Sequence, residues 1–160
     1  MRPRVPPPVI TLIGAVLMWA LHRRVPVAHW VLPPWNRFGA LAAGVGIGIA
    51  LAAFTRFRQE RTTVDPLDPG KATQLVTDNV FSISRNPMYL GMLLLLIGWA
   101  LWLGSASVWL IPPLFLAVMT YAQIVPEEQA LTQRFGAQYA AYCREVSRWL
   151  GRRATPWAGR

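Results

Sequence analysis

The feature that most constrains this 160-residue chain is a long apolar stretch, free of any charged side chain, between Arg85 and Glu127. A tight turn at Leu103–Ser107 divides it into two segments, each about long enough to cross a hydrocarbon core of roughly 30 Å. Because a bilayer offers the backbone no hydrogen-bond partners, both segments are expected to be helices. The stretch therefore predicts an antiparallel transmembrane hairpin whose polar ends emerge on the same membrane face.

Two further apolar segments precede this hairpin, and hydrophobic residues make up 54% of the chain against 14% charged residues. Charge confined to a few blocks of so apolar a chain is typical of an integral membrane protein. We therefore expect one all-α membrane domain over 1–160, with about four transmembrane helices and a C-terminal amphipathic helix. The expected segments are helices at about 5–21, 38–54, 88–104 and 105–125, a cytoplasmic loop at 56–87 and an amphipathic segment at 127–153.

Single residue types predict further details of these segments. Small residues recur at every fourth position of the second segment, which lines them up on a face expected to pack against a neighbouring helix. They are Ala40, Gly44, Gly48 and Ala52. Pro112 and Pro113 are expected to kink the fourth helix near its start. The connection at 59–85 is rich in turn formers and is expected to fold back onto the membrane surface. The first apolar run follows two arginines without a small-residue cleavage pattern after it, so a retained helix is expected.

Sixteen basic residues face seven acidic ones, for a net charge of +9. In so apolar a chain, arginines at cytoplasmic helix ends facing anionic lipid explain this charge better than a nucleic-acid partner does. With the N-terminus inside, thirteen Lys and Arg fall on the cytoplasmic side and three outside. Both termini are therefore expected in the cytoplasm, and the Arg- and Ala-rich composition suggests a bacterial inner membrane. Cys143 is the single cysteine, and His22 and His29 lie in another loop, so no metal site is expected.

Polar residues gather at the two ends of the predicted hairpin, Arg85 to Tyr89 at its start and Glu127–Glu128 at its finish. Adjacent glutamates diverge by about 100° on a helix, so they are not expected to form a paired acid–base dyad. A guanidinium–carboxylate pair at the membrane interface would form a polar pocket. Three simpler roles stay open at this point. The glutamates would suit a helix start, Asn86 a helix cap, and Tyr89 the membrane interface.

Three motifs together resemble a known family. They are Arg85-Asn86-Pro87-Met88-Tyr89-Leu90-Gly91, Glu127-Glu128-Gln129-Ala130-Leu131 and Phe135-Gly136-Ala137-Gln138-Tyr139-Ala140-Ala141-Tyr142. In order and spacing they are similar to the integral membrane methyltransferases of the isoprenylcysteine carboxyl methyltransferase and phospholipid N-methyltransferase group. The resemblance implies S-adenosylmethionine in a cytoplasm-facing pocket and a lipophilic or amphipathic methyl acceptor reaching it from the bilayer.

Carried over residue by residue, the resemblance implies a set of cofactor-binding residues. They are Arg85, Asn86, Pro87, Tyr89, Gly91, Glu127, Glu128, Tyr139 and Tyr142. The chain departs from the family pattern at three places. Asn86 stands where the family usually has histidine, and Asn79-Val80 replaces a Gly-Pro. Gln123 stands where eukaryotic prenylcysteine enzymes carry an arginine suited to a carboxylate substrate.

Methyl transfer from a sulfonium is an in-line displacement, so the protein chiefly aligns the reactants and excludes water. An acceptor nucleophile that carries a proton needs a proton acceptor, for which Glu127, Glu128 and Tyr89 are the candidate catalytic residues. Two alternatives remain. One is an NADPH-dependent membrane reductase with a related helical frame. The other is a non-enzymatic scaffold whose face of small residues in the second segment docks a partner helix.

Overall fold

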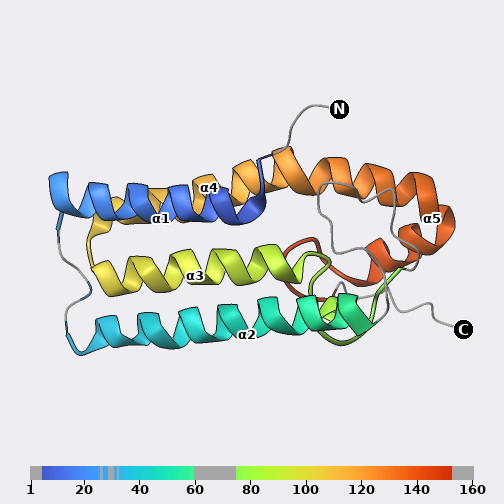
Figure 1. Cartoon of the computed structure of the whole chain (residues 1–160), viewed down its shortest axis with the longest axis horizontal. Coiled ribbons are helices and arrows are strands. Elements are labelled where there is room, and N and C mark those ends of the chain that lie inside the picture. The colour runs from blue at the N-terminus through green and yellow to red at the C-terminus, as the bar shows by residue number, and fades with distance from the viewer. Residues whose placement is uncertain (1–4, 26, 29–30, 32, 60–74, 153–160) are drawn as a thin grey trace, which may run out of the picture.

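The computed structural model of the chain describes residues 5–25, 27–28, 31, 33–59 and 75–152. Within them the fold is all-α, as expected, and the main helices lie side by side along one axis (Figure 1). They are α1 (Pro7–Arg24), α2 (Phe38–Gln59), α3 (Pro87–Leu103), α4 (Ile111–Met119) and α5 (Val125–Glu145). Most of the long connection between α2 and α3, with its expected turn residues at 60–74, lies outside the described residues, as do the termini at 1–4 and 153–160.

Two helical stretches are both long and apolar enough to cross a bilayer, Trp35–Arg56 and Ala106–Glu145. The helix α3 is shorter, but it is apolar throughout and carries no charged residue. Large apolar side chains on α1 and α2 are exposed, including Leu12 and Leu41, each 64% exposed. Exposing large apolar side chains to water costs free energy, so these outer faces are suited to contact with the hydrocarbon of a bilayer.

The closest helix pair is α2 and α3, and glycines set their separation. A Cβ built at Gly39 would lie 2.3 Å from the carbonyl oxygen of Gly98, and one at Gly46 would lie 2.6 Å from that of Gly91. Only a missing side chain permits this backbone approach. The predicted face of small residues is therefore wrong, because Gly39 and Gly46 lie on a neighbouring face of α2. A Cβ at Gly44, on that predicted face, would meet nothing within 4 Å.

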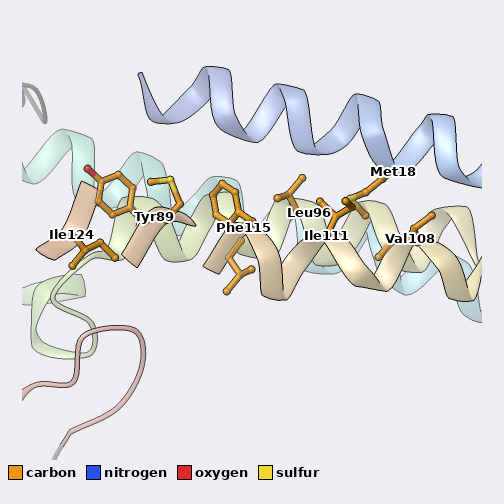
Figure 2. Close-up of a cluster of buried hydrophobic side chains, with 10 residues drawn as sticks. Met18, Tyr89, Leu96, Val108, Ile111, Phe115 and Ile124 are labelled. Carbon is orange, nitrogen blue, oxygen red and sulfur yellow. The ribbon is translucent and has the colours of Figure 1, made fainter. Parts of the chain in front are cut away.

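The main core lies where α3 meets α1 and α4. Figure 2 shows a row of buried side chains that runs from Tyr89 and Ile124 at one end of the bundle to Met18 and Val108 at the other. Met18 and Val108 are fully buried, and Leu96 in the middle of the row is 1% exposed. This packing fixes the axial positions of the three helices, and so fixes which residues meet at the Tyr89 end.

The two prolines of the fourth helix do not kink it, contrary to the prediction. A short 3₁₀ turn at Ala106–Leu110 leads into α4, so Pro112 and Pro113 occupy the first helical turn, where no backbone bond is lost. The irregularity lies further on, where the π-helical turn Thr120–Ile124 joins α4 to α5. Pro126 follows this turn and has no N–H to donate to the preceding turn, which accounts for the altered backbone register there.

The C-terminal segment also differs from the expected single amphipathic helix at 127–153. The helix α5 extends the line of α4 beyond the bundle and turns back at Gly136, where φ is 48° and ψ is −118° (Figure 1). It ends at Glu145, because Val146 is extended and forms an isolated bridge with Arg152. The returning half of α5 buries Tyr139 and Tyr142 in a second apolar cluster with Phe81. The chain after α5 is thereby brought to the start of α3.

Candidate active site

A charged network joins three segments at this end of the bundle. Arg85 precedes α3, Glu128 lies in the first turn of α5, and Arg148 follows α5. Arg85 Nη2 lies 3.2 Å from Glu128 Oε1, while Arg148 donates from Nε to Oε1 at 3.0 Å and from Nη2 to Oε2 at 2.7 Å. The Arg85 side chain is only 7% exposed and that of Glu128 16%. The hydrogen bonds that Arg148 donates to Glu128 raise the pKa of Arg148 above its ordinary value. The network thus holds two positive charges around one carboxylate.

Backbone contacts hold the segment after α5 against the turn before α3. The amide of Arg85 donates to the carbonyl of Ser147 at 3.1 Å, and the amide of Gly151 donates to that of Ile83 at 2.8 Å. The Asn86 side chain adds a third contact, since its Nδ2 donates to the carbonyl of Arg148 at 3.0 Å. Asn86 occupies the N-cap position of α3, one of the roles considered for it, although its side chain makes no cap bond there. Its amide instead fixes the position of Arg148.

The two glutamates diverge as expected, and Glu127 faces a different partner. The Tyr89 hydroxyl donates to Glu127 Oε1 at 2.5 Å. Tyr89 is 5% exposed and belongs to the main core, so the role of an interfacial aromatic does not apply to it. A phenol bonded to a carboxylate in a buried setting forms a strong, charge-assisted hydrogen bond. This places a potential proton acceptor at the edge of the core.

Three further predicted site residues have three different sets of contacts. Tyr139 belongs to the network, since its hydroxyl oxygen lies 3.4 Å from Arg85 Nη1, which also contacts Cys143 Sγ. The Tyr142 hydroxyl donates to the carbonyl of Phe81 at 2.6 Å and anchors the turn before α3. Gly91 lies in the seam with α2, where a Cβ would meet the Gly46 carbonyl oxygen at 2.5 Å. Helix packing alone is therefore a sufficient reason for glycine at position 91.

The residues of this cluster fit S-adenosylmethionine, whose amino acid moiety carries a carboxylate and an ammonium group. Arg85 Nε is buried and has no hydrogen-bond partner within the described part of the chain. An unpaired buried donor of this kind is costly unless a ligand accepts from it. Guanidinium groups suit a carboxylate, and Glu127 and Glu128 suit an ammonium or hydroxyl group. The cluster therefore offers both charges at one place.

Near the site, Arg148 was not predicted from the sequence, and Gln123 was singled out only as a departure from the family pattern. Arg148 is one of several C-terminal arginines, and spacing alone does not distinguish it from those expected to face lipid. Gln123 is 1% exposed in the π-helical turn, one turn before Glu127. Its Nε2 donates to the carbonyl of Val5 at 2.8 Å, whereas its Oε1 is buried without a partner among the residues described. Pro126, inside an otherwise helical pattern, was the available signal for an irregular turn here.

The profile of the phospholipid methyltransferase family matches residues 35–138, which cover α2, α3, α4 and α5 as far as the returning turn. A protein from Haemophilus influenzae strain Rd, described only as uncharacterized, is 44% identical over 63 residues. That match covers 39% of this chain and the whole of the relative. No solved structure matches the chain.

Proposed function

The chain belongs to the phospholipid methyltransferase family, and we propose that it methylates a lipidic or amphipathic acceptor at the cytoplasmic face of the membrane, with S-adenosylmethionine as methyl donor. The observation that carries the proposal is the convergence of Arg85, Glu128 and Arg148 beside the Tyr89–Glu127 pair. These residues come from segments far apart in the chain. They meet at the end of an apolar bundle. A polar cofactor from the aqueous side and a membrane-soluble acceptor can both reach these residues there.

Within this proposal, the charged network holds the cofactor. The unpaired Arg85 Nε and the guanidinium of Arg148 would bind the carboxylate of the cofactor, and Asn86 and Pro87 form the start of α3 beside them. Tyr139 closes the pocket from the returning half of α5, while Tyr142 holds that half in place. When bound, S-adenosylmethionine supplies an electrophilic methyl group on a sulfonium. The protein contributes alignment and exclusion of water.

The Tyr89–Glu127 pair supplies the proton acceptor in this mechanism. The Tyr89 oxygen would accept the proton that an acceptor N–H or O–H loses, while the phenolic proton would pass to Glu127 Oε1. Glu128 is held by two arginines and not by Tyr89, so we assign it to cofactor positioning. The neutral oxygen of Gln123 lies one helical turn away, where a guanidinium would suit a carboxylate. This favours an amine or hydroxyl nucleophile over a prenylcysteine carboxylate, although the frame is similar to the isoprenylcysteine carboxyl methyltransferases.

We further propose four membrane spans, formed by α1, α2, α3 and the α4–α5 stretch, with both termini in the cytoplasm of a bacterial cell. The positive charges support this orientation. Arg56 lies in the last turn of α2, and Arg85 and Arg148 belong to the charged network of the site. Arg23 and Arg24 end α1 and Arg37 precedes α2, and these helix ends lie opposite α5 (Figure 1). With these charges as the guide, we propose that the site faces the cytoplasm, where soluble cofactor is present.

Calorimetric titration tests the proposal directly. S-adenosylmethionine and S-adenosylhomocysteine are titrated into the detergent-purified protein, and NADPH is titrated in parallel for the reductase alternative. Both methyl-cycle ligands are expected to bind in the micromolar range. Glu128→Gln is expected to weaken both, whereas Tyr121→Phe, a change at a 77% exposed side chain, leaves affinity unchanged. Folded protein that binds neither ligand would overturn the proposal, and an NADPH response would favour the reductase.

A further inference from the structure

Gln123 is a buried polar side chain whose oxygen has no partner among the described residues. It lies in the π-helical turn Thr120–Ile124 and is 1% exposed. Its Nε2 donates to the carbonyl of Val5 at 2.8 Å. Because a carbonyl can only accept, this contact fixes which end of the amide is the nitrogen, and Oε1 is left as a buried acceptor without a donor. Such an acceptor is costly unless a ligand donates to it.

This oxygen belongs to the same part of the core as the Tyr89–Glu127 pair. Gln123 precedes Glu127 by four residues on one continuous helical stretch, so their Cβ atoms are about 6 Å apart on one side of it. Ile124, the next residue, packs in the main core at the Tyr89 end (Figure 2). The Tyr89 hydroxyl in turn donates to Glu127 at 2.5 Å. Two sets of oxygen acceptors therefore lie about one helical turn apart, in a π-helical turn of a kind often found at functional sites.

Two neighbouring acceptors suit a nucleophile that carries two donors. A neutral primary amine has two N–H groups and a lone pair, so it can donate one N–H to the Tyr89 oxygen and the other to Gln123 Oε1 while the lone pair faces the methyl group. An alcohol has one O–H, and an ionised carboxylate has none. Either of these would leave the buried oxygen of Gln123 unpaired. A site built around a hydrogen bond strongly rejects a ligand that cannot make it.

We propose that Gln123 is the residue that selects a primary amine as methyl acceptor and favours the addition of a single methyl group. The amine nitrogen forms a bond to the methyl carbon as the carbon–sulfur bond breaks, and the electron pair of that bond stays on sulfur. One proton of the resulting ammonium passes to the Tyr89 oxygen as the phenolic proton passes to Glu127. The secondary amine that results has one N–H and cannot serve both acceptors, so a second transfer is slower. The inference rests on the proposed function and adds to it the reacting group of the acceptor.

The first test compares acceptors that differ only at the nucleophile. Dodecylamine, N-methyldodecylamine and dodecanol are supplied in micelles with S-adenosylmethionine that carries a labelled methyl group. We expect kcat/KM to be at least about tenfold higher for the primary amine than for either other probe. Gln123→Met keeps the length of the side chain but has no amide oxygen. It is expected to lower kcat/KM for dodecylamine about tenfold and to leave the secondary amine within about twofold, so that the preference disappears. Gln133→Met makes the same change at an exposed position of α5 and is expected to keep the preference.

A second readout does not depend on turnover. Dodecylamine is titrated calorimetrically into protein saturated with S-adenosylhomocysteine, and Gln123→Met is expected to weaken its binding about tenfold with S-adenosylhomocysteine affinity near wild type. Gln123→Glu loses the donor to Val5 but keeps an acceptor oxygen, so it is expected to retain the preference for the primary amine.

Three results would overturn the inference. They are wild-type protein that does not prefer dodecylamine or does not methylate it, Gln123→Met with wild-type selectivity, and Gln123→Met that loses S-adenosylhomocysteine affinity alone, which would assign the oxygen to the cofactor. The wild-type comparison holds even if the variant does not fold. Failure of the wild-type protein to bind S-adenosylhomocysteine would instead overturn the proposed function.

Discussion

Replacing Glu128 by glutamine is expected to destabilise the whole site end of the protein. The change keeps the shape of the side chain and one acceptor oxygen, but it removes the only carboxylate between Arg85 and Arg148. Arg85 is 7% exposed, so its charge would be left buried and uncompensated, a situation that typically costs about 3–5 kcal/mol. Arg148 is 37% exposed and water screens it, so its pair contributes at most about 1 kcal/mol. We expect a loss of about 3 kcal/mol in the free energy of unfolding, mostly from Arg85.

The assay is equilibrium unfolding in mixed micelles, with Glu145→Gln as the control. That residue is the last of the same helix and is exposed, so its change is expected to stay within about 0.5 kcal/mol. Arg85→Gln combined with Glu128→Gln should recover part of the loss, because the uncompensated charge is then absent. A loss below about 0.5 kcal/mol for Glu128→Gln alone would refute the view that this carboxylate neutralises a buried arginine.

Three further predictions follow from other parts of the structure. Tyr89→Phe should lower kcat for methyl transfer about 10²-fold without changing S-adenosylhomocysteine affinity, and an unchanged rate would exclude the phenol from proton transfer. Gly46→Ala should lower the free energy of unfolding by more than about 1 kcal/mol, because its Cβ would lie 2.6 Å from a backbone oxygen of α3. A Cβ at Gly48 would meet nothing within 4 Å, so Gly48→Ala should leave the free energy of unfolding unchanged or raise it slightly. Unfolding of the two variants measured side by side would show the difference. The hydrogen bond from an arginine of α2 lowers the pKa of Asp78 below its ordinary 3.8. This ion pair contributes at most about 1 kcal/mol to the free energy of unfolding, and the contribution is present above pH 3.8. It is lost as the pH falls through the lowered pKa of Asp78 in the folded protein. Unfolding measured at a series of acid pH values should show this loss.

The helical hairpin and the meeting of its ends were predictable from local properties of the sequence. In an apolar environment the uncharged stretch between Arg85 and Glu127 must satisfy its own backbone hydrogen bonds, which favours helices. Its length is enough for two membrane-spanning helices of roughly equal length. Equal arms return to the same level, so Tyr89 and Glu127 were expected to be neighbours before any contact was known. The divergence of the two glutamates followed in the same way from the geometry of one helix.

Tertiary structure alone decided the finer arrangement, because it depends on comparisons between segments far apart in the chain. Gly46 and Gly48 both lack a side chain, so either could allow a close helix contact. Only the position of α3 in the folded protein shows that the contact is at Gly46. The choice of Arg148 among the C-terminal arginines depends on the turn at Gly136 and on the extended backbone after α5. Sequence periodicity describes which residues share a face of one helix. Which face meets which neighbour is a property of the assembled bundle, and here that decided both the helix seam and the partners of Glu128.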